Sequence, residues 1–152
     1  MLYAENPPEE LAEYTGFLLG FLGARSRAQF IRLLEPHGFH PREFGLLQVI
    51  GARPGITQQE LATLARVDPS SMVAALDELE ARGLAERRVD PEDRRRRSVH
   101  LTSAGKDEMR RLRREARKAG GEFLAVLEPA ERDELNRLLR KLAGLSPAPD
   151  RP

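Results

Sequence analysis

The sequence predicts a mainly helical protein with one small β hairpin, and three observations lead to this fold class. Apolar residues recur at helical spacing through most of the 152 residues. From about residue 84 to residue 102 the period changes from 3.6 to 2, as in strands. Charged residues make up 32% of the chain and there is no cysteine, which excludes disulfides and thiolate metal sites. We therefore expect one compact domain.

A long helix is predicted to open at Pro7 and Pro8 and to run to about residue 34. Its apolar residues form a broad stripe on one face. The stretch 14–24 is too short to cross a bilayer and follows several glutamates, where a signal peptide carries positive charge. The sequence thus predicts a cytoplasmic protein with no membrane partner. A second, buried helix is predicted between residues 41 and 54.

Two short helices follow. Thr57 and Glu60 have the spacing of a capping box, which predicts a helix start at Thr57. Asp68 and Pro69 are a good N-cap and first residue for the next helix, with a stop at Gly83. The expected buried stripe of this second helix consists of Met72, Val73, Leu76 and Leu79. The turn between the helices has helix-turn-helix length, and the alternative is a helical hairpin in an ordinary bundle.

A β hairpin is predicted directly after these two helices. Apolar and polar residues alternate in "LAERRV" at 84–89 and again in "RSVHLT" at 97–102. Asp90 and Pro91 are turn residues between them. A hairpin in this position is a wing, so the fold class is a winged helix-turn-helix with a wing of two or three strands.

Further helices are predicted after Thr102, an available N-cap. A basic helix covers 106–118, Gly120 and Gly121 are expected to kink it, and a last amphipathic helix follows. The leucines expected to point inward on that last helix are Leu135, Leu138, Leu139 and Leu142. We divide the chain into an N-terminal helix (1–36), a winged module (37–105), C-terminal helices (106–145) and a disordered tail (146–152).

Charge is distributed unevenly along the chain. The whole sequence carries a formal charge of +1, but residues 82–118 alone carry +7 and residues 1–81 carry −5. A local basic block in an otherwise acidic chain is typical of a surface that binds nucleic acid.

The stretch 56–109 resembles the core of the MarR family of bacterial transcriptional regulators. The matching pieces are "ELATLARVDPSSMVAALDELEARGL", the wing motif D-x-R at Asp93-Arg94-Arg95, and "LTSAG" at 101–105. The resemblance implies a homodimer in which the N- and C-terminal helices of both subunits interleave. It also implies a sequence-specific transcriptional regulator, expected here to be a ligand-responsive repressor that binds a palindromic operator in double-stranded DNA.

The resemblance assigns DNA contacts to specific residues. Asp93 would orient Arg95 in the minor groove. Arg94 and Arg96 would reach phosphates or solvent, and Arg97 would only solvate a strand edge. On the recognition helix the expected contacts come from Pro69, Ser70, Ser71 and Ala74. Gln58 and Gln59 are plausible backbone contacts at the start of the preceding helix. Because the recognition helix lacks long polar side chains at its exposed start, we expect the wing and the DNA shape to carry more of the sequence specificity.

Family members often bind small aromatic ligands in a cleft between the dimer helices and the winged module. The residues that could line such a cleft here are Tyr14, Phe17, Phe21, His40 and Phe44, with core packing as the alternative for each. A non-specific architectural DNA-binding protein remains an alternative function. A metal-responsive regulator is another: His37 and His40, with Glu35, are the only hint of metal ligands, and a zinc site needs three or four. No metal, cofactor or enzymatic activity is expected.

Overall fold

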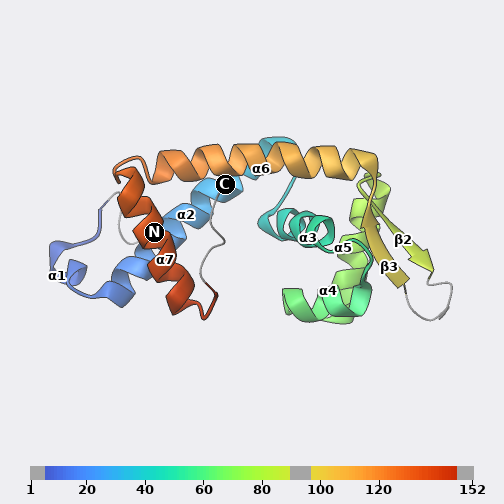
Figure 1. Ribbon diagram of the computed structural model, residues 1–152, viewed down its shortest axis with the longest axis horizontal. Coiled ribbons are helices and arrows are strands. Elements are labelled where there is room, and N and C mark those ends of the chain that lie inside the picture. The colour runs from blue at the N-terminus through green and yellow to red at the C-terminus, as the bar shows by residue number, and fades with distance from the viewer. Residues whose placement is uncertain (1–5, 90–96, 147–152) are drawn as a thin grey trace.

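The computed structural model describes residues 6–89 and 97–146, and it confirms the predicted fold class (Figure 1). The helices are α1 (Glu9–Ala12), α2 (Thr15–Leu34), the short 3-10 helix η1 (Glu35–His37), α3 (Pro41–Ala52), α4 (Gln58–Ala65), α5 (Pro69–Ala81), α6 (Ser103–Phe123) and α7 (Pro129–Leu142). The strands are β1 (Ile56–Thr57), β2 (Ala85–Val89) and β3 (Arg97–Leu101).

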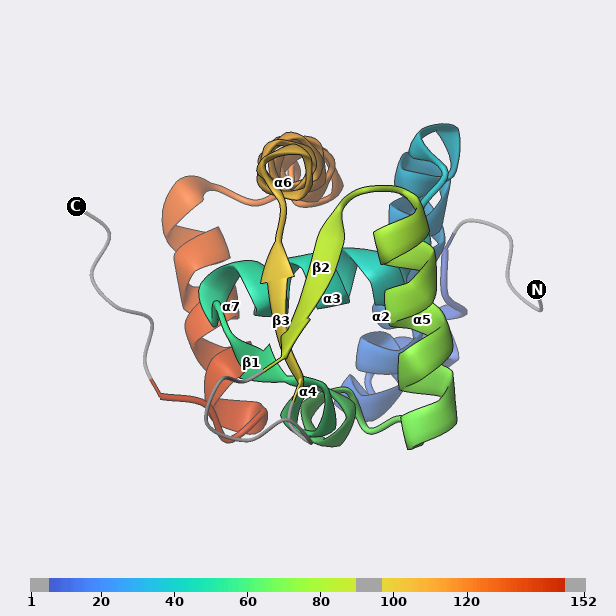
Figure 2. The same ribbon diagram turned by 90° about the vertical axis from the view of Figure 1, so that its right-hand side faces the viewer.

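The elements lie along the long helix α6. Figure 1 shows α1, α2 and α7 towards one end of this helix and α4, α5 and the sheet at the other, with α3 between them. The sheet is antiparallel with the order β1-β3-β2, and Val99 of β3 lies opposite Ile56 on one side and Arg87 on the other. In Figure 2, β2 runs alongside α5 and β3 leads into α6. This end of the molecule is the winged helix-turn-helix.

Local capping fixes the ends of the helices in this module. The Thr57 hydroxyl accepts a hydrogen bond from the N–H of Glu60 (3.2 Å), and the Glu60 carboxylate accepts one from the N–H of Thr57 (2.8 Å). The Asp68 carboxylate accepts from the N–H of Ser71 (2.9 Å), and the Thr102 hydroxyl accepts from the N–H of Gly105 (3.0 Å). The predicted capping box and both predicted N-caps are therefore confirmed, and side-chain caps of this kind stabilise a helix by about 1 kcal/mol each.

The hydrophobic core lies almost entirely within the winged module and the helices that cover it. Its fully buried members are Leu34, Leu47, Ile50, Leu61, Met72, Leu76, Leu79, Val99 and Leu112. Residues 6–33 and 113–146, by contrast, contain no buried residue. The two ends of the chain therefore present apolar side chains that this single chain does not cover.

A close approach joins α6 to the wing. The Thr102 hydroxyl donates to the carbonyl of Gly83 (2.6 Å), and the Thr102 N–H donates to the carbonyl of Leu84 (3.1 Å). A Cβ on Gly105 would lie 1.8 Å from that Leu84 carbonyl oxygen. Only glycine allows the first turn of α6 to pack this closely on the backbone.

One sequence-based prediction about the helices is wrong. The first helix is broken at Glu13 and Tyr14, where the backbone of Tyr14 is extended. Helix α6 continues through Gly120 and Gly121 without a break. On α7 the leucines Leu138, Leu139 and Leu142, which were predicted to point inward, are exposed, and no residue of this helix is buried in the single chain.

Candidate nucleic-acid interface

The recognition helix α5 buries one face and exposes the other. Met72, Leu76 and Leu79 are buried against the core, and the N-terminal half of the opposite face is exposed. That exposed half carries Ser70, Val73 and Ala74. It is uncharged and small, so it can approach a DNA groove closely but cannot form the bidentate arginine–guanine contact.

One position on α5 differs from the prediction. Val73 was expected in the buried stripe but is 37% exposed, whereas Ala75 is buried and only 7% exposed. Between residues 72 and 79 there are more apolar residues than one buried helix face can hold, so the sequence pattern does not decide which of them are buried. The structure places Val73, which sequence reasoning missed, beside Ala74 on the outer face.

The other predicted recognition residues differ in how exposed they are. Pro69 and Ser70 are exposed at the start of α5, but Ser71 is half-buried, and its carbonyl accepts a hydrogen bond from the Arg42 guanidinium (2.6 Å). The hydrogen bonds from Ser71 also hold the pKa of the capping Asp68 carboxyl below its usual value. Asp68 is therefore a stable anion that fixes the first turn of α5.

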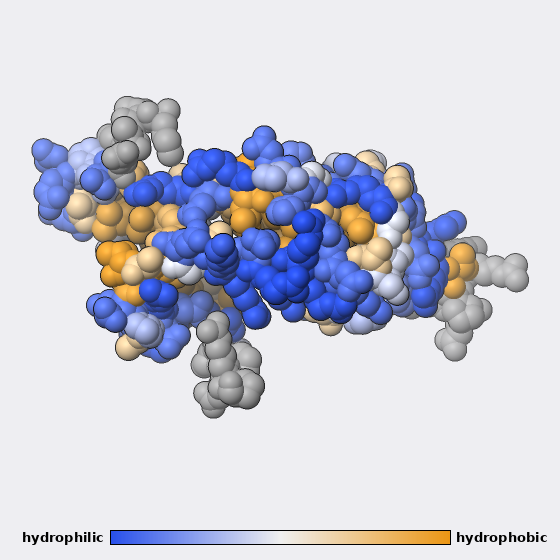
Figure 3. Space-filling model, turned by 90° about the horizontal axis from the view of Figure 1, so that it is seen from above, coloured by the Kyte–Doolittle hydropathy of each residue, from blue (hydrophilic) through white to orange (hydrophobic). Residues whose placement is uncertain are grey.

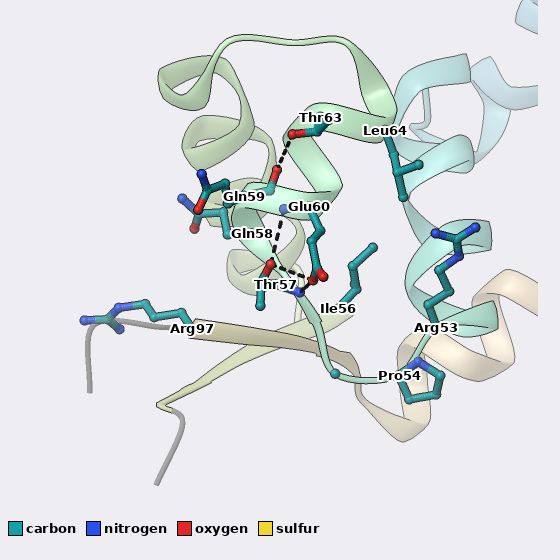
Figure 4. A pocket seen from close by; sticks show the side chains of 11 residues that line it. Arg53, Pro54, Ile56, Thr57, Gln58, Gln59, Glu60, Thr63, Leu64 and Arg97 are labelled. Carbon is teal, nitrogen blue, oxygen red and sulfur yellow. Dashed lines mark hydrogen bonds between the residues drawn. The ribbon is translucent and has the colours of Figure 1, made fainter. Parts of the chain in front are cut away.

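A pocket lies between α4, β1 and the start of β3 (Figure 4). It is an open groove of about 990 Å³. In Figure 4, Arg53 and Arg97 stand on opposite sides of it, and Gln58 and Gln59 extend from the start of α4. Two guanidinium groups, two amides and the N-terminus of α4 are groups that hydrogen-bond phosphate, although Glu60 also lies in this groove.

The wing is described only up to its base. Val89 lies opposite Arg97 in the last pair of the hairpin. Asp93, Arg94, Arg95 and Arg96, the predicted tip contacts, lie outside the described residues. Arg97 is exposed at the base of the wing and lines the groove beside α4. It therefore lies in the same groove as Gln58 and Gln59, the predicted DNA-backbone contacts, and does not only border a strand edge.

Sequence reasoning also missed Arg87 on β2. Its guanidinium donates to the Glu80 carboxylate (Nε–Oε2, 3.0 Å) and pairs with the Asp77 carboxylate, both on α5. It also lies 3.5 Å from the amide oxygen of Gln58 on α4. These hydrogen bonds and charges lower the pKa of Glu80 and raise that of Arg87. The seven-residue spacing of Glu80 and Arg87 across a turn carried no signal in the sequence.

The predicted ligand-cleft residues fall into two groups, one at each end of α2. Phe17 and Phe21 stack on each other (centroids 6.3 Å apart), and Tyr14 lies exposed just before them. Phe44 instead packs on Phe30, with centroids 5.0 Å apart. At 1.5 Å per residue, Tyr14 and Phe30 are roughly 24 Å apart along the helix. One chain therefore does not bring these aromatic residues into a single cavity.

The structure gives no support for a metal site at His37 and His40. His37 Nδ1 lies 2.9 Å from a guanidinium nitrogen of Arg111. The backbone N–H of His40, not its ring, donates to the Glu43 carboxylate at the start of α3 (2.7 Å). Within residues 6–89 and 97–146 no group of three or more histidine or acidic side chains could hold a metal ion. Over the same residues no helix is long and apolar enough to cross a membrane.

Comparisons with known proteins agree with this geometry. The family model described as the MarR family matches residues 37–96. The chain is 37% identical over 142 residues to a protein from Thauera aromatica named as a transcriptional regulator for the hcr operon, covering 88% of this chain and 86% of the relative.

Solved structures extend the agreement to almost the whole chain. The transcriptional repressor CouR, bound to a 23-mer DNA duplex, matches with a TM-score of 0.79 and 31% identity over 92% of this chain and 99% of that one. CouR from Rhodococcus jostii bound to p-coumaroyl-CoA matches with a TM-score of 0.73 and 26% identity over 95% of this chain and 100% of that one. With its helix-turn-helix, its wing and relatives this similar along most of their length, the chain is a transcriptional regulator that belongs to the MarR family.

Proposed function

We propose that the protein is a repressor that binds a palindromic operator as a homodimer and releases it when a small aromatic ligand binds. The observation that carries the proposal is the exposed, uncharged start of α5, a helix that packs against both α4 and strand β2 of the wing. The DNA-bound repressor CouR has the same fold. Such a regulator would act in the cytoplasm, where its DNA lies, and the proposal assigns it no catalytic role.

The proposed DNA contacts combine groove and phosphate binding. Ser70 and Ala74, with Val73 added by the structure, would enter the major groove together with Pro69, whereas Ser71 would act mainly through the helix cap. Apolar side chains of this size suit the methyl group of thymine. Gln58 and Gln59 would bind phosphates beside Arg97 in the groove at the start of α4. Asp93, Arg94, Arg95 and Arg96 would supply the minor-groove and phosphate contacts of the wing tip.

The exposed apolar residues at the ends of the chain support the homodimer. Figure 3 shows hydrophobic side chains gathered at the end of the molecule that holds α1, α2 and α7. The large exposed residues there include Tyr14, Leu19, Leu22, Leu138, Leu139, Leu142 and Leu145. A surface of this kind without a cover usually marks an interface, and a two-fold dimer would cover the same patch on both subunits.

The ligand proposal depends on the dimer. CouR binds p-coumaroyl-CoA, an aromatic acyl thioester, and a related aromatic compound is the class proposed here. Tyr14, Phe17 and Phe21 lie at one end of α2, and His40 and Phe44 follow its other end. If two α2 helices cross in opposite directions, one subunit's first group lies near its partner's second group. The proposed cleft would therefore form only between subunits.

DNA selection from fragmented genomic DNA, followed by sequencing, tests the DNA proposal. We expect discrete palindromic sites with half-sites about one helical turn apart, as two-fold dimers of such modules require. Uniform coverage would instead favour the architectural DNA-binding protein, the alternative suggested by the uncharged start of the recognition helix. Titration of the bound complex with aromatic acids and their CoA thioesters then tests release, and no release by any of them would contradict the ligand proposal.

A further inference from the structure

We propose that Arg87 is a positioning residue for DNA binding, because it fixes the wing to both helices of the helix-turn-helix and pairs with two carboxylates at the acidic end of the recognition helix. This inference rests on the proposed DNA-binding function. The residues involved form the Arg87 cluster, defined as Arg87 with Gln58, Asp77 and Glu80.

One guanidinium group connects all three elements that face DNA. Arg87 belongs to β2, Gln58 is the first residue of α4, and Asp77 and Glu80 lie on α5. The contact to Glu80 has two parts: Arg87 Nε donates to Oε2 (3.0 Å), and the Arg87 backbone N–H donates to Oε1 (2.7 Å). Both the strand and its side chain are therefore held against α5, and the rigid planar fork of arginine suits such multiple contacts.

Burial separates this arginine from the other cations of the hairpin. The Arg87 side chain is 17% exposed, whereas Arg88, the next residue on the same strand, is 62% exposed and pairs with Glu86 of its own strand. Neighbouring residues of a strand point to opposite faces. Arg87 therefore faces the helices, and Arg88 faces away from them with the same charge.

The charge of α5 explains why this arrangement matters for a polyanionic partner. Between Pro69 and Ala81 the helix carries Asp77, Glu78 and Glu80 and no basic residue. Carboxylates within the screening length of about 8–10 Å repel DNA phosphates. The described ion pairs of Asp77 and Glu80 are both with Arg87, so this one cation pairs with two of the three carboxylates and reduces the net charge of this end of α5 from −3 to −2.

The Glu80→Gln variant distinguishes a positioning role from simple electrostatics, because the two predict opposite changes in DNA affinity. Glu80→Gln removes a negative charge near DNA, so electrostatics alone predicts tighter binding. If Glu80 acts by holding Arg87 and the wing, the same variant binds more weakly. We expect a loss of about three- to tenfold, as for disruption of one member of a coupled charge network. Tighter or unchanged binding by Glu80→Gln would overturn the inference.

Arg87→Ala and Arg88→Ala form a matched pair, because each removes one positive charge from the same strand. We expect Arg87→Ala to weaken binding by about tenfold or more, since it leaves two carboxylates without their cation. Arg88→Ala should cost only a few-fold, and its salt slope should fall by no more than the ~0.9 expected for one phosphate contact. A larger fall in slope for Arg87→Ala would show that the wing has also moved away from the DNA backbone.

The assay uses the full-length protein and two DNA probes. One is the duplex that the wild type enriches most from a random-sequence pool, and the other is a random duplex of equal length. Fluorescence anisotropy at several salt concentrations gives the dissociation constants, and circular dichroism with thermal melting checks that each variant is folded. If Arg87→Ala does not fold, Glu80→Gln and Asp77→Asn still decide the question.

The possible failures are distinguishable. If the wild type binds neither duplex, the proposed DNA-binding function is wrong. If the wild type binds but Arg87→Ala and Arg88→Ala lose affinity equally with equal salt slopes, the function stands and the positioning role of Arg87 is overturned.

Discussion

Replacing Gly105 with alanine is expected to destabilise the protein, although alanine normally favours a helix. Gly105 lies in the first turn of α6, and a Cβ there would be 1.8 Å from the carbonyl oxygen of Leu84. The atom in the way belongs to the backbone, so it cannot rotate aside as a flexible side chain would. The first turn of α6 and the start of the wing must therefore separate.

The magnitude follows from three contributions. Alanine gains about 1 kcal/mol over glycine inside a helix. Forcing extra volume into a packed contact costs about 1–3 kcal/mol. The separation also weakens the two hydrogen bonds from Thr102 to Gly83 and Leu84, each worth about 1 kcal/mol. We expect the free energy of unfolding to fall by about 2–4 kcal/mol, with a loss of roughly 2–4 °C in the melting temperature for each kcal/mol.

Urea unfolding followed by circular dichroism measures this change, at one protein concentration because subunit association would contribute to stability. Gly121→Ala is the matched control: it lies in the same helix, and a Cβ there meets no atom within 4 Å. This control should be more stable than the wild type by up to about 1 kcal/mol. If Gly105→Ala is as stable as Gly121→Ala, the argument from the close approach is refuted.

Three further predictions follow. Replacing thymine by uracil in each half-site removes a methyl group, and it should weaken operator binding by the wild type by roughly 1 kcal/mol or more for each thymine methyl group that Val73 touches. The same DNA change should weaken binding by the Val73→Ala variant much less. Equal losses for the two proteins in anisotropy assays would exclude a methyl contact of Val73. Leu142→Glu should convert the dimer to monomers, because it places a charge in the proposed interface, and a dimer that persists in sedimentation measurements would contradict that interface. The Glu80 pKa is lowered by its hydrogen bonds with Arg87, so the stabilisation from its ionised form is present at neutral pH and is lost as the pH falls from the ordinary value through the lowered one. The stability difference between the wild type and Glu80→Gln should therefore shrink between pH 7 and acidic pH, and a constant difference in urea unfolding would argue against this contribution.

The features that could be predicted from the sequence are those fixed by neighbouring residues. The caps at Thr57, Asp68 and Thr102 each involve partners three residues away, so their spacing is visible in the chain. The hairpin likewise follows from alternation within short segments. Local chemistry of this kind determines where each element begins and ends.

The parts that could not be predicted depend on contacts between distant segments. The Arg87 cluster joins residues 29 positions apart, and nothing near Arg87 in the sequence distinguishes it from Arg88. The phase of α5 failed at Val73 because apolar residues are more numerous there than buried positions. The leucines of α7 follow a correct amphipathic pattern, but the chain alone offers no core for them to enter.

Helix α6 connects the two ends of the molecule as one continuous rod. Its 21 residues span roughly 30 Å at 1.5 Å per residue, and its first turn is bonded to the wing through Thr102. A tilt of only about 5° at its far end would displace the wing by roughly 2.7 Å over that length. The spacing between the two winged modules of a dimer would then depend on the angle between the two α6 helices, and not on any contact near the DNA.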